Sequence, residues 1–467
     1  MSQDHKKSPP PIFFIIALGL IGFGAYKFLP SLFASKSSDT PSSTSTPGAS
    51  PSGAIATRIS LGNQILVTSQ TTPEKQAGVA AFKNGDYQTA AQKFQASLKQ
   101  NRNDPETVIY LNNATASNGS SLKIAVSVPI GSNPNVAQEI LRGVAQAQSD
   151  INNSGGINSA KLQVEIVNDD NDPKIVKEVA ETLTKDASIL AVIGHNASNA
   201  SLEAAPIYQQ EKLVMVTPTS FANNLSGFGS YIFRTVPNIK VMAQPLAEYA
   251  VKTAGTTNIA VCYDSQAPDN ISFKDEFVAA LTAAGGKLVP TVCDFAIPSF
   301  NPETAIDDAV TKGAQALMLA PHIDRIDRTI SVASINRGKL PLYGSTTMYT
   351  FQTLKDGQKS VDGLILPVPW HPKINPGSSF AKNSQRWGGV VNWRTATSFD
   401  AAQAVIAGLQ KNTTREGLQQ ALKSTSFATP GASEDVKFLP SGDRAGEPIL
   451  VQVKPTGNTG YNFVPLR

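Results

Sequence analysis

The sequence has few of the side chains that metal and redox centres require. It contains two cysteines and four histidines among 467 residues. His195, His322 and His371 are separated by long stretches of chain, whereas metal ligands usually occur at short, regular spacings. We therefore expect neither a metal site nor a cofactor.

Charged residues are also sparse, at 16% of the chain, with a net charge of +4. Lysine and arginine are scattered through the sequence. Nucleic-acid-binding proteins instead concentrate these residues in a patch or stripe. The charge distribution therefore excludes a nucleic-acid partner.

The sequence lacks the short motifs of the common enzyme classes. It has no G-x-S-x-G nucleophile elbow, no H-E-x-x-H zinc motif and no phosphate-binding G-x-x-x-x-G-K-[ST] loop. These absences predict a protein that is not an enzyme.

A long apolar segment lies near the N-terminus. Residues 12–26 are all apolar or glycine and follow Lys6 and Lys7, so the segment at 11–33 is about long enough to cross a bilayer. A cleaved signal is the alternative, but Leu32 does not suit a cleavage site at Ala34. We favour an uncleaved anchor in the inner (plasma) membrane, with the lysines on the cytoplasmic side. Both interpretations place the rest of the chain outside the cytoplasm.

Residues 35–56 are rich in serine, threonine and proline and predict a flexible linker. Residues 57–118 have helical periodicity around a Gly85-Asp86 turn, and Pro105 opens a further helix. This segment is similar to one tetratricopeptide repeat. Because one repeat cannot bury a continuous core, the unit must dock on the large domain or on a protein partner. A helical spacer and a protein-binding unit both remain open.

From residue 121 onward, short apolar strands alternate with helices, as at 122–128, 162–167 and 189–193. This alternation predicts an α/β fold with parallel sheets. The pattern restarts after Pro237 with strands at 259–263, 287–292, 316–320 and 363–368, which predicts a second lobe of the same kind.

Two neighbouring strands of the first lobe end in polar tips. The strand at 189–193 is followed by Gly194 to Ser198, and the strand at 213–216 by Thr217 to Ser220. Parallel strands present their carboxyl ends at one edge of the sheet, where open α/β folds bind ligands. We therefore expect a binding site at this edge.

The same stretch resembles the periplasmic solute-binding proteins of ABC transporters, in the branched-chain amino acid (Leu/Ile/Val) receptor family. The resemblance rests on Ile193-Gly194-His195, Ser198, the tip Thr217-Pro218-Thr219-Ser220 and Phe233-Arg234-Thr235, and it extends from about residue 121 to the C-terminus. It implies the type I fold, in which two Rossmann-like lobes enclose a ligand cleft. The implied lobes are 121–240 with 370–440, and 241–369 with 441–467.

The resemblance also implies site residues. In that family a serine at the position of Ser198 holds the carboxylate of the ligand; a plain helix cap is the alternative interpretation. Phe221 stands where the family has a threonine, and Thr346 where it has the glutamate that pairs with the ligand ammonium. Asp264, Asp269 or Asp324 could supply the missing carboxylate. The predicted ligand-binding residues are Ser198, Thr219, Ser220, Asn196, Phe221, Asp264, His322 and Thr346.

Cys262 and Cys293 follow two strands of the second lobe that are expected to be neighbours. In an oxidising compartment they form either a disulfide or two buried thiols.

Two functions follow from these expectations. The first is a receptor that captures a small polar solute, such as an amino acid, by lobe closure and delivers it to an ABC permease. The second is a membrane-anchored sensor or scaffold that keeps this fold and acts through the helical unit.

Overall fold

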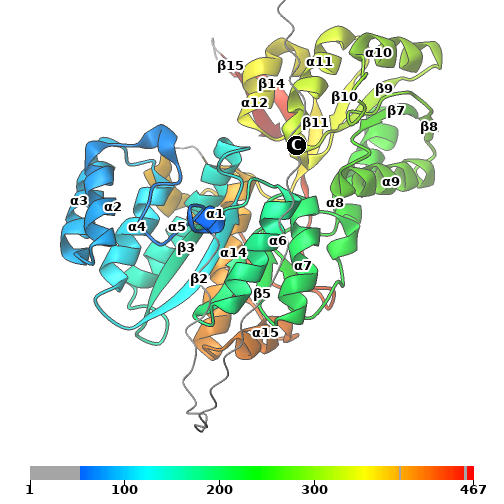
Figure 1. The fold of residues 1–467 in the computed structure, drawn as a ribbon. Coiled ribbons are helices and arrows are strands. Elements are labelled where there is room, and N and C mark those ends of the chain that lie inside the picture. Colours follow the sequence, from blue (N-terminus) through cyan, green and yellow to red (C-terminus); the bar gives the residue numbers. More distant parts are fainter. Residues whose placement is uncertain (1–52, 389–390, 457–459, 467) are drawn as a thin grey trace, which may run out of the picture. The chain divides into compact units, whose positions relative to one another are not determined.

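The computed structural model describes residues 53–388, 391–456 and 460–466 (Figure 1). All of them belong to one unit of the chain. The predicted membrane segment at 11–33 and the linker up to residue 52 lie outside the described residues. Within the described residues, no helix combines the length and the apolar character that crossing a membrane requires.

The first lobe is built on a six-stranded sheet with the order β1-β3-β2-β4-β5-β6. All its pairings are parallel except that of β1 with β3. The predicted strands are present, and the strands β1 and β6 were not predicted. The bounds are β1 Ile59–Ser60, β2 Ser121–Val128, β3 Lys161–Asn168, β4 Ile189–Ile193, β5 Val214–Thr217 and β6 Ile232–Arg234.

Helices cover both faces of this sheet because its central strands are apolar on both sides (Figure 1). The helices α6 and α7 pack with Val192 and Met215, whereas α5 and α14 share a core with Ile193 and Val216. The bounds of these helices are α5 Pro134–Asn153, α6 Pro173–Lys185, α7 Ser198–Gln210 and α14 Trp393–Lys411.

The helices α5 and α14 approach closely at Gly143. A Cβ atom at this position would lie 2.2 Å from the carbonyl oxygen of Thr395 and 2.6 Å from the backbone nitrogen of Phe399. Only glycine fits between the two helices here, and its small size lets α14 lie against the first lobe.

The helical unit contains α2 (Pro73–Lys83), α3 (Tyr87–Gln100) and α4 (Pro105–Ala116), preceded by the single turn α1 (Gly53–Ala56). The side chains of Thr72, Asp86 and Asp104 cap the three longer helices. The turn α1 occupies the last four residues of the predicted linker, which therefore ends before residue 53.

This unit docks on the first lobe. Its strand β1 extends the sheet, and Asn113 of α4 bonds to both the backbone carbonyl (2.7 Å) and the backbone N–H (2.9 Å) of Val164 in β3. Of the two docking partners considered above, the structure shows the large domain.

The second lobe contains a seven-stranded sheet with the order β15-β14-β11-β10-β9-β7-β8. Its core strands are parallel, while β14 and β15 are antiparallel additions. The predicted strand at 287–292 is shorter than expected, since β8 ends before Pro290. The strand bounds are β7 Asn258–Tyr263, β8 Lys287–Val289, β9 Ala316–Ala320, β10 Leu342–Gly344, β11 Ile365–Val368, β14 Ile449–Thr456 and β15 Gly460–Pro465.

The helices of this lobe and of the connecting segments complete the architecture. The bounds are α8 Ile239–Glu248, α9 Pro268–Ala283, α10 Pro302–Thr311, α11 Ile326–Asn336, α12 Phe351–Gly357, α13 Ser379–Asn383 and α15 Arg415–Lys423, with the short strands β12 Thr429–Pro430 and β13 Asp435–Val436. Cys262 at the end of β7 and Cys293 beyond β8 form a disulfide with a Cα–Cα distance of 4.6 Å.

The last return of the chain to the second lobe comes later than the predicted residue 441. Asp443 is bridged to Arg234 of β6, and the Arg234 guanidinium contacts the Asp443 carboxylate at 2.5 Å. This buried ion pair holds residues 441–443 beside the first-lobe sheet, and β14 begins only at Ile449.

Candidate functional site

A small cavity lies at the polar edge of the first lobe and is also lined by residues of the second lobe. Its volume is about 30 Å³, enough for one or two water molecules. The cavity is partly open to solvent but smaller than an amino acid, so binding such a solute requires its walls to rearrange. The lining residues are Asn196, Ala197, Ser198, Thr219, Phe221, Asp269, His322, Ile323, Thr347, Trp393 and Arg394.

Ser198 is the first residue of α7, and the N-cap is Ala197. The Ser198 hydroxyl is therefore not a cap of its own helix. Its oxygen accepts the backbone N–H groups of Phe221 at 3.1 Å and Ala222 at 3.2 Å. A hydroxyl has two lone pairs and one proton. Since both lone pairs are used, the proton is left to donate toward the cavity.

Asn196 and Thr219 form the neighbouring part of the wall. The Thr219 hydroxyl donates to the backbone carbonyl of Asn196 at 2.8 Å. Its proton is therefore engaged, and its oxygen can act toward a ligand only as an acceptor.

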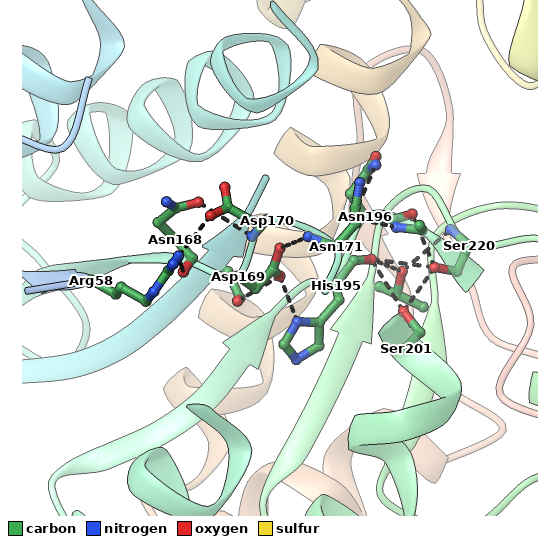
Figure 2. Close-up of polar contacts among 12 residues, drawn as sticks. Arg58, Asn168, Asp169, Asp170, Asn171, His195, Asn196, Ser201 and Ser220 are labelled. Atoms are coloured by element: carbon green, nitrogen blue, oxygen red, sulfur yellow. Dashed lines mark hydrogen bonds and ion pairs between the residues drawn. The ribbon is translucent and has the colours of Figure 1, made fainter. Parts of the chain in front are cut away.

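Ser220 does not line the cavity. Its hydroxyl lies in a buried network with Ser201 at 2.8 Å and the backbone carbonyls of His195 and Asn196 (Figure 2). The network holds the tip that follows β4 against the tip that follows β5. Ser220 thus positions the wall without forming part of it.

A second set of contacts fixes the same tip from the other side. Asp169 lies 2.6 Å from Nδ1 of His195, and Asn171 accepts the backbone N–H of Ala197 at 3.2 Å (Figure 2). Both residues belong to the loop between β3 and α6. The polar edge is therefore braced by three loops of the first lobe.

The second lobe contributes Asp269 from the first turn of α9 and His322 from the loop after β9. Burial raises the pKa of Asp269, and the nearby His322 imidazole partly opposes that rise. The His322 Nδ1 accepts the backbone N–H of Asp324 at 3.3 Å, while its buried Nε2 has no hydrogen-bond partner in the described part of the chain.

Two further lining residues come from the crossing between the lobes, at the start of α14. Trp393 is buried, and its Nε1 has no hydrogen-bond partner among the described residues. Arg394 lies over the Trp393 ring at 4.5 Å, and its Nη1 donates to the backbone carbonyl of Tyr349 at 2.8 Å. Arg394 also lies 3.4 Å from Glu139 of α5.

Trp393 and Arg394 were not among the predicted site residues, because neither follows a strand of the predicted sheets. Asn392 could have indicated that a helix begins here, because asparagine is a common helix-capping residue. Its side chain accepts the backbone N–H of Arg394.

Two of the predicted second-lobe residues do not line the cavity. The buried Asp264 pairs with Arg325. The Thr346 hydroxyl donates to the backbone carbonyl of Pro367 at 2.8 Å, and its neighbour Thr347 takes the place in the wall. Phe221 does line the cavity, where its ring packs 5.7 Å from that of Trp393.

The two-lobed fold agrees with the family that the sequence matches. The profile of the family described as "Periplasmic binding protein" matches residues 121–458. The chain belongs to the periplasmic binding protein family. Family membership supports a location outside the cytoplasm. It also supports the expectation of a protein that is not an enzyme, because the family consists of solute-binding receptors.

Part of the chain is also similar to individual members of the family. The Leu/Ile/Val-binding protein of Escherichia coli is 35% identical over 125 residues, which is 27% of this chain and 34% of that protein. This chain therefore matches only about a third of the length of that relative.

Solved structures of periplasmic binding proteins share the fold. An ABC transporter substrate-binding protein from Desulfitobacterium hafniense in complex with Leu is 22% identical, with a TM-score of 0.63 over 74% of this chain and 100% of that one. A solute-binding protein from R. palustris in complex with 4-hydroxybenzoate is 15% identical, with a TM-score of 0.64 over 73% and 95% of the two chains. At these identities the likeness shows the fold alone.

Proposed function

We propose that the protein is an extracytoplasmic receptor that captures a small amino-acid-like solute between its lobes and delivers it to an ABC-type importer. The cavity carries the proposal, because it brings the Asp269 carboxylate and the Ser198 hydroxyl into one site. An amino acid carries an ammonium and a carboxylate that these two groups can bind.

Each end of such a solute has a counterpart. The free proton of Ser198 suits the carboxylate of the solute. Asp269 suits the ammonium, and in this proposal it takes the role of the family glutamate that Thr346 replaces. The N-terminal segment at 11–33 would anchor the receptor to the membrane.

Thermal unfolding of the full-length chain with each of the common amino acids tests the proposal. A solute that binds only the folded state raises the unfolding temperature in proportion to its affinity and concentration. We expect a rise for a subset of amino acids. No rise with any of them at millimolar concentration would contradict the proposal.

A further inference from the structure

The cavity offers a solute more hydrogen-bond donors than an aliphatic amino acid can use. The donors come from the second lobe and from the crossing segment, and they include two buried nitrogen atoms without partners, Nε2 of His322 and Nε1 of Trp393. Leaving such groups unpaired costs free energy, so a solute that pairs with them is favoured.

The Nδ1 atom of His322 is occupied by Asp324, whose backbone nitrogen lies 3.3 Å away and whose carboxylate lies 3.4 Å away. The Nε2 atom carries a proton in the imidazolium and in the neutral tautomer whose Nδ1 accepts. The imidazole therefore acts as a donor at the cavity. The indole of Trp393 is a donor in every state.

Arg394 adds a charged donor. Within the described residues its hydrogen bonds, to the backbone carbonyl of Tyr349 and to Glu139, both use Nη1. A guanidinium has five N–H groups in a planar fork. The contact with Glu139 at 3.4 Å is long and made through a single nitrogen, so Arg394 keeps donors for a further acceptor.

The apolar part of the wall is mainly aromatic. Ile323 is its sole branched aliphatic residue, and the Phe221 and Trp393 rings supply the rest of its large apolar surface. Ser198 and Asp269 account for the two charged groups that every amino acid carries. The donors of His322, Trp393 and Arg394 then remain for the side chain of the solute.

From this arrangement we infer that the solute is an amino acid whose side chain ends in acceptor oxygens, an acidic or carboxamide amino acid, rather than a branched-chain one. The inference rests on the proposed receptor function and names its substrate class.

Isothermal titration calorimetry of the full-length chain tests the inference. The ligands are aspartate, glutamate, asparagine and glutamine, compared with leucine, isoleucine and valine. We expect the tightest member of the first set to bind at least tenfold more tightly than any member of the second. Equal or tighter binding of a branched-chain amino acid would overturn the inference and leave the receptor function standing. No binding by any amino acid would overturn both.

The variant Trp393→Phe tests the donor directly, since it removes the indole N–H and keeps an aromatic ring. We expect it to reduce the preference for the first set by about fivefold or more. The matched control is Trp387→Phe, because Trp387 is equally buried but donates to Gln146 at 3.3 Å and does not line the cavity. Circular dichroism checks that both variants are folded. If folded Trp393→Phe keeps the preference of the parent protein, the indole N–H does not donate to the solute side chain.

A dicarboxylate without an ammonium group supplies the last test. Succinate and glutarate leave Asp269 without a partner, so we expect them to bind at least tenfold more weakly than aspartate and glutamate. Equal binding would overturn the assignment of the solute as an amino acid.

Discussion

Ser198 is the residue whose hydrogen bonds define one end of the cavity. Its proton has no acceptor in the described part of the chain, while its oxygen holds the loop at Phe221 and Ala222. Replacement by alanine therefore removes a donor to the solute and an acceptor for two backbone amides.

We predict that Ser198→Ala weakens solute binding by about 1–3 kcal/mol, the usual contribution of a hydrogen bond to a charged group together with the cost of losing it. Calorimetry with the best ligand measures the loss. Ser149→Ala is the control, since Ser149 is a buried first-lobe serine that does not line the cavity. The prediction is wrong if both variants keep the affinity of the parent protein.

Asp269 predicts the pH dependence of binding. Burial raises its pKa above the ordinary 3.8, and a solute ammonium requires the ionised carboxylate. Affinity should therefore be highest near neutral pH and fall as the pH is lowered through the raised pKa, earlier than an ordinary aspartate would allow.

Binding titrations between pH 7 and pH 4 measure this fall in affinity. The variant Asp269→Asn should bind weakly at every pH and lose most of the pH dependence. Asp275→Asn provides the control, because Asp275 is an exposed residue on the same helix. A pH profile in Asp269→Asn that matches the parent protein would assign the effect to another group.

At the scale of elements, the helical unit is held to the first lobe by Asn113. Its side chain bonds to Leu61, Gln148 and both backbone groups of Val164, so both N–H donors and both lone pairs of the amide are used. We predict that Asn113→Ala lowers the free energy of unfolding by roughly 1–3 kcal/mol, since buried partners lose their bonds.

Urea unfolding measures that change. The neighbouring Asn112 is partly buried and bonds to Val108 and Ser149. Asn112→Ala should therefore cost less. A larger loss in Asn112→Ala than in Asn113→Ala would contradict the account of how the unit docks.

The contact of α5 with α14 gives a second prediction at this scale. Gly143→Ala would place a methyl group against the backbone of α14, and we expect a destabilisation of about 1–3 kcal/mol from overpacking. Gly119→Ala has open space around the added methyl group and should be close to neutral. Equal unfolding midpoints for the two variants would contradict a tight contact between α5 and α14 at Gly143.

The sequence allowed the parallel strands to be predicted because each is a short apolar run that ends at a polar tip. Ser198 and Thr219 follow directly from that pattern. Asp269 was named only as one of three candidate carboxylates, because it lies at a helix start and does not follow a strand. Trp393 and Arg394 were missed, because they reach the cavity from a lobe crossing far away in the chain. The antiparallel strand β1 was missed as well, since two residues carry no periodicity.

At the scale of the whole molecule, the account requires two lobes that open and close. A cavity of about 30 Å³ is too small for an amino acid in this conformation. Arg394 lines the cavity and contacts both Glu139 of the first lobe and the backbone of Tyr349 in the second, so it connects the two lobes at the site. A solute shifts the balance between open and closed lobes only if it binds one of the two states more tightly. Contacts with both lobes at this site, made only when the lobes are closed, would provide that difference.

The most direct test is the distance between spin labels on the two lobes of the full-length chain. Glu203→Cys on α7 and Asp327→Cys on α11 provide exposed positions, and pulsed electron paramagnetic resonance reads the distance distribution with and without the best-binding amino acid. We predict that the distribution shifts to shorter distances and narrows when the solute is bound. An identical distribution at saturating solute would contradict capture by lobe closure.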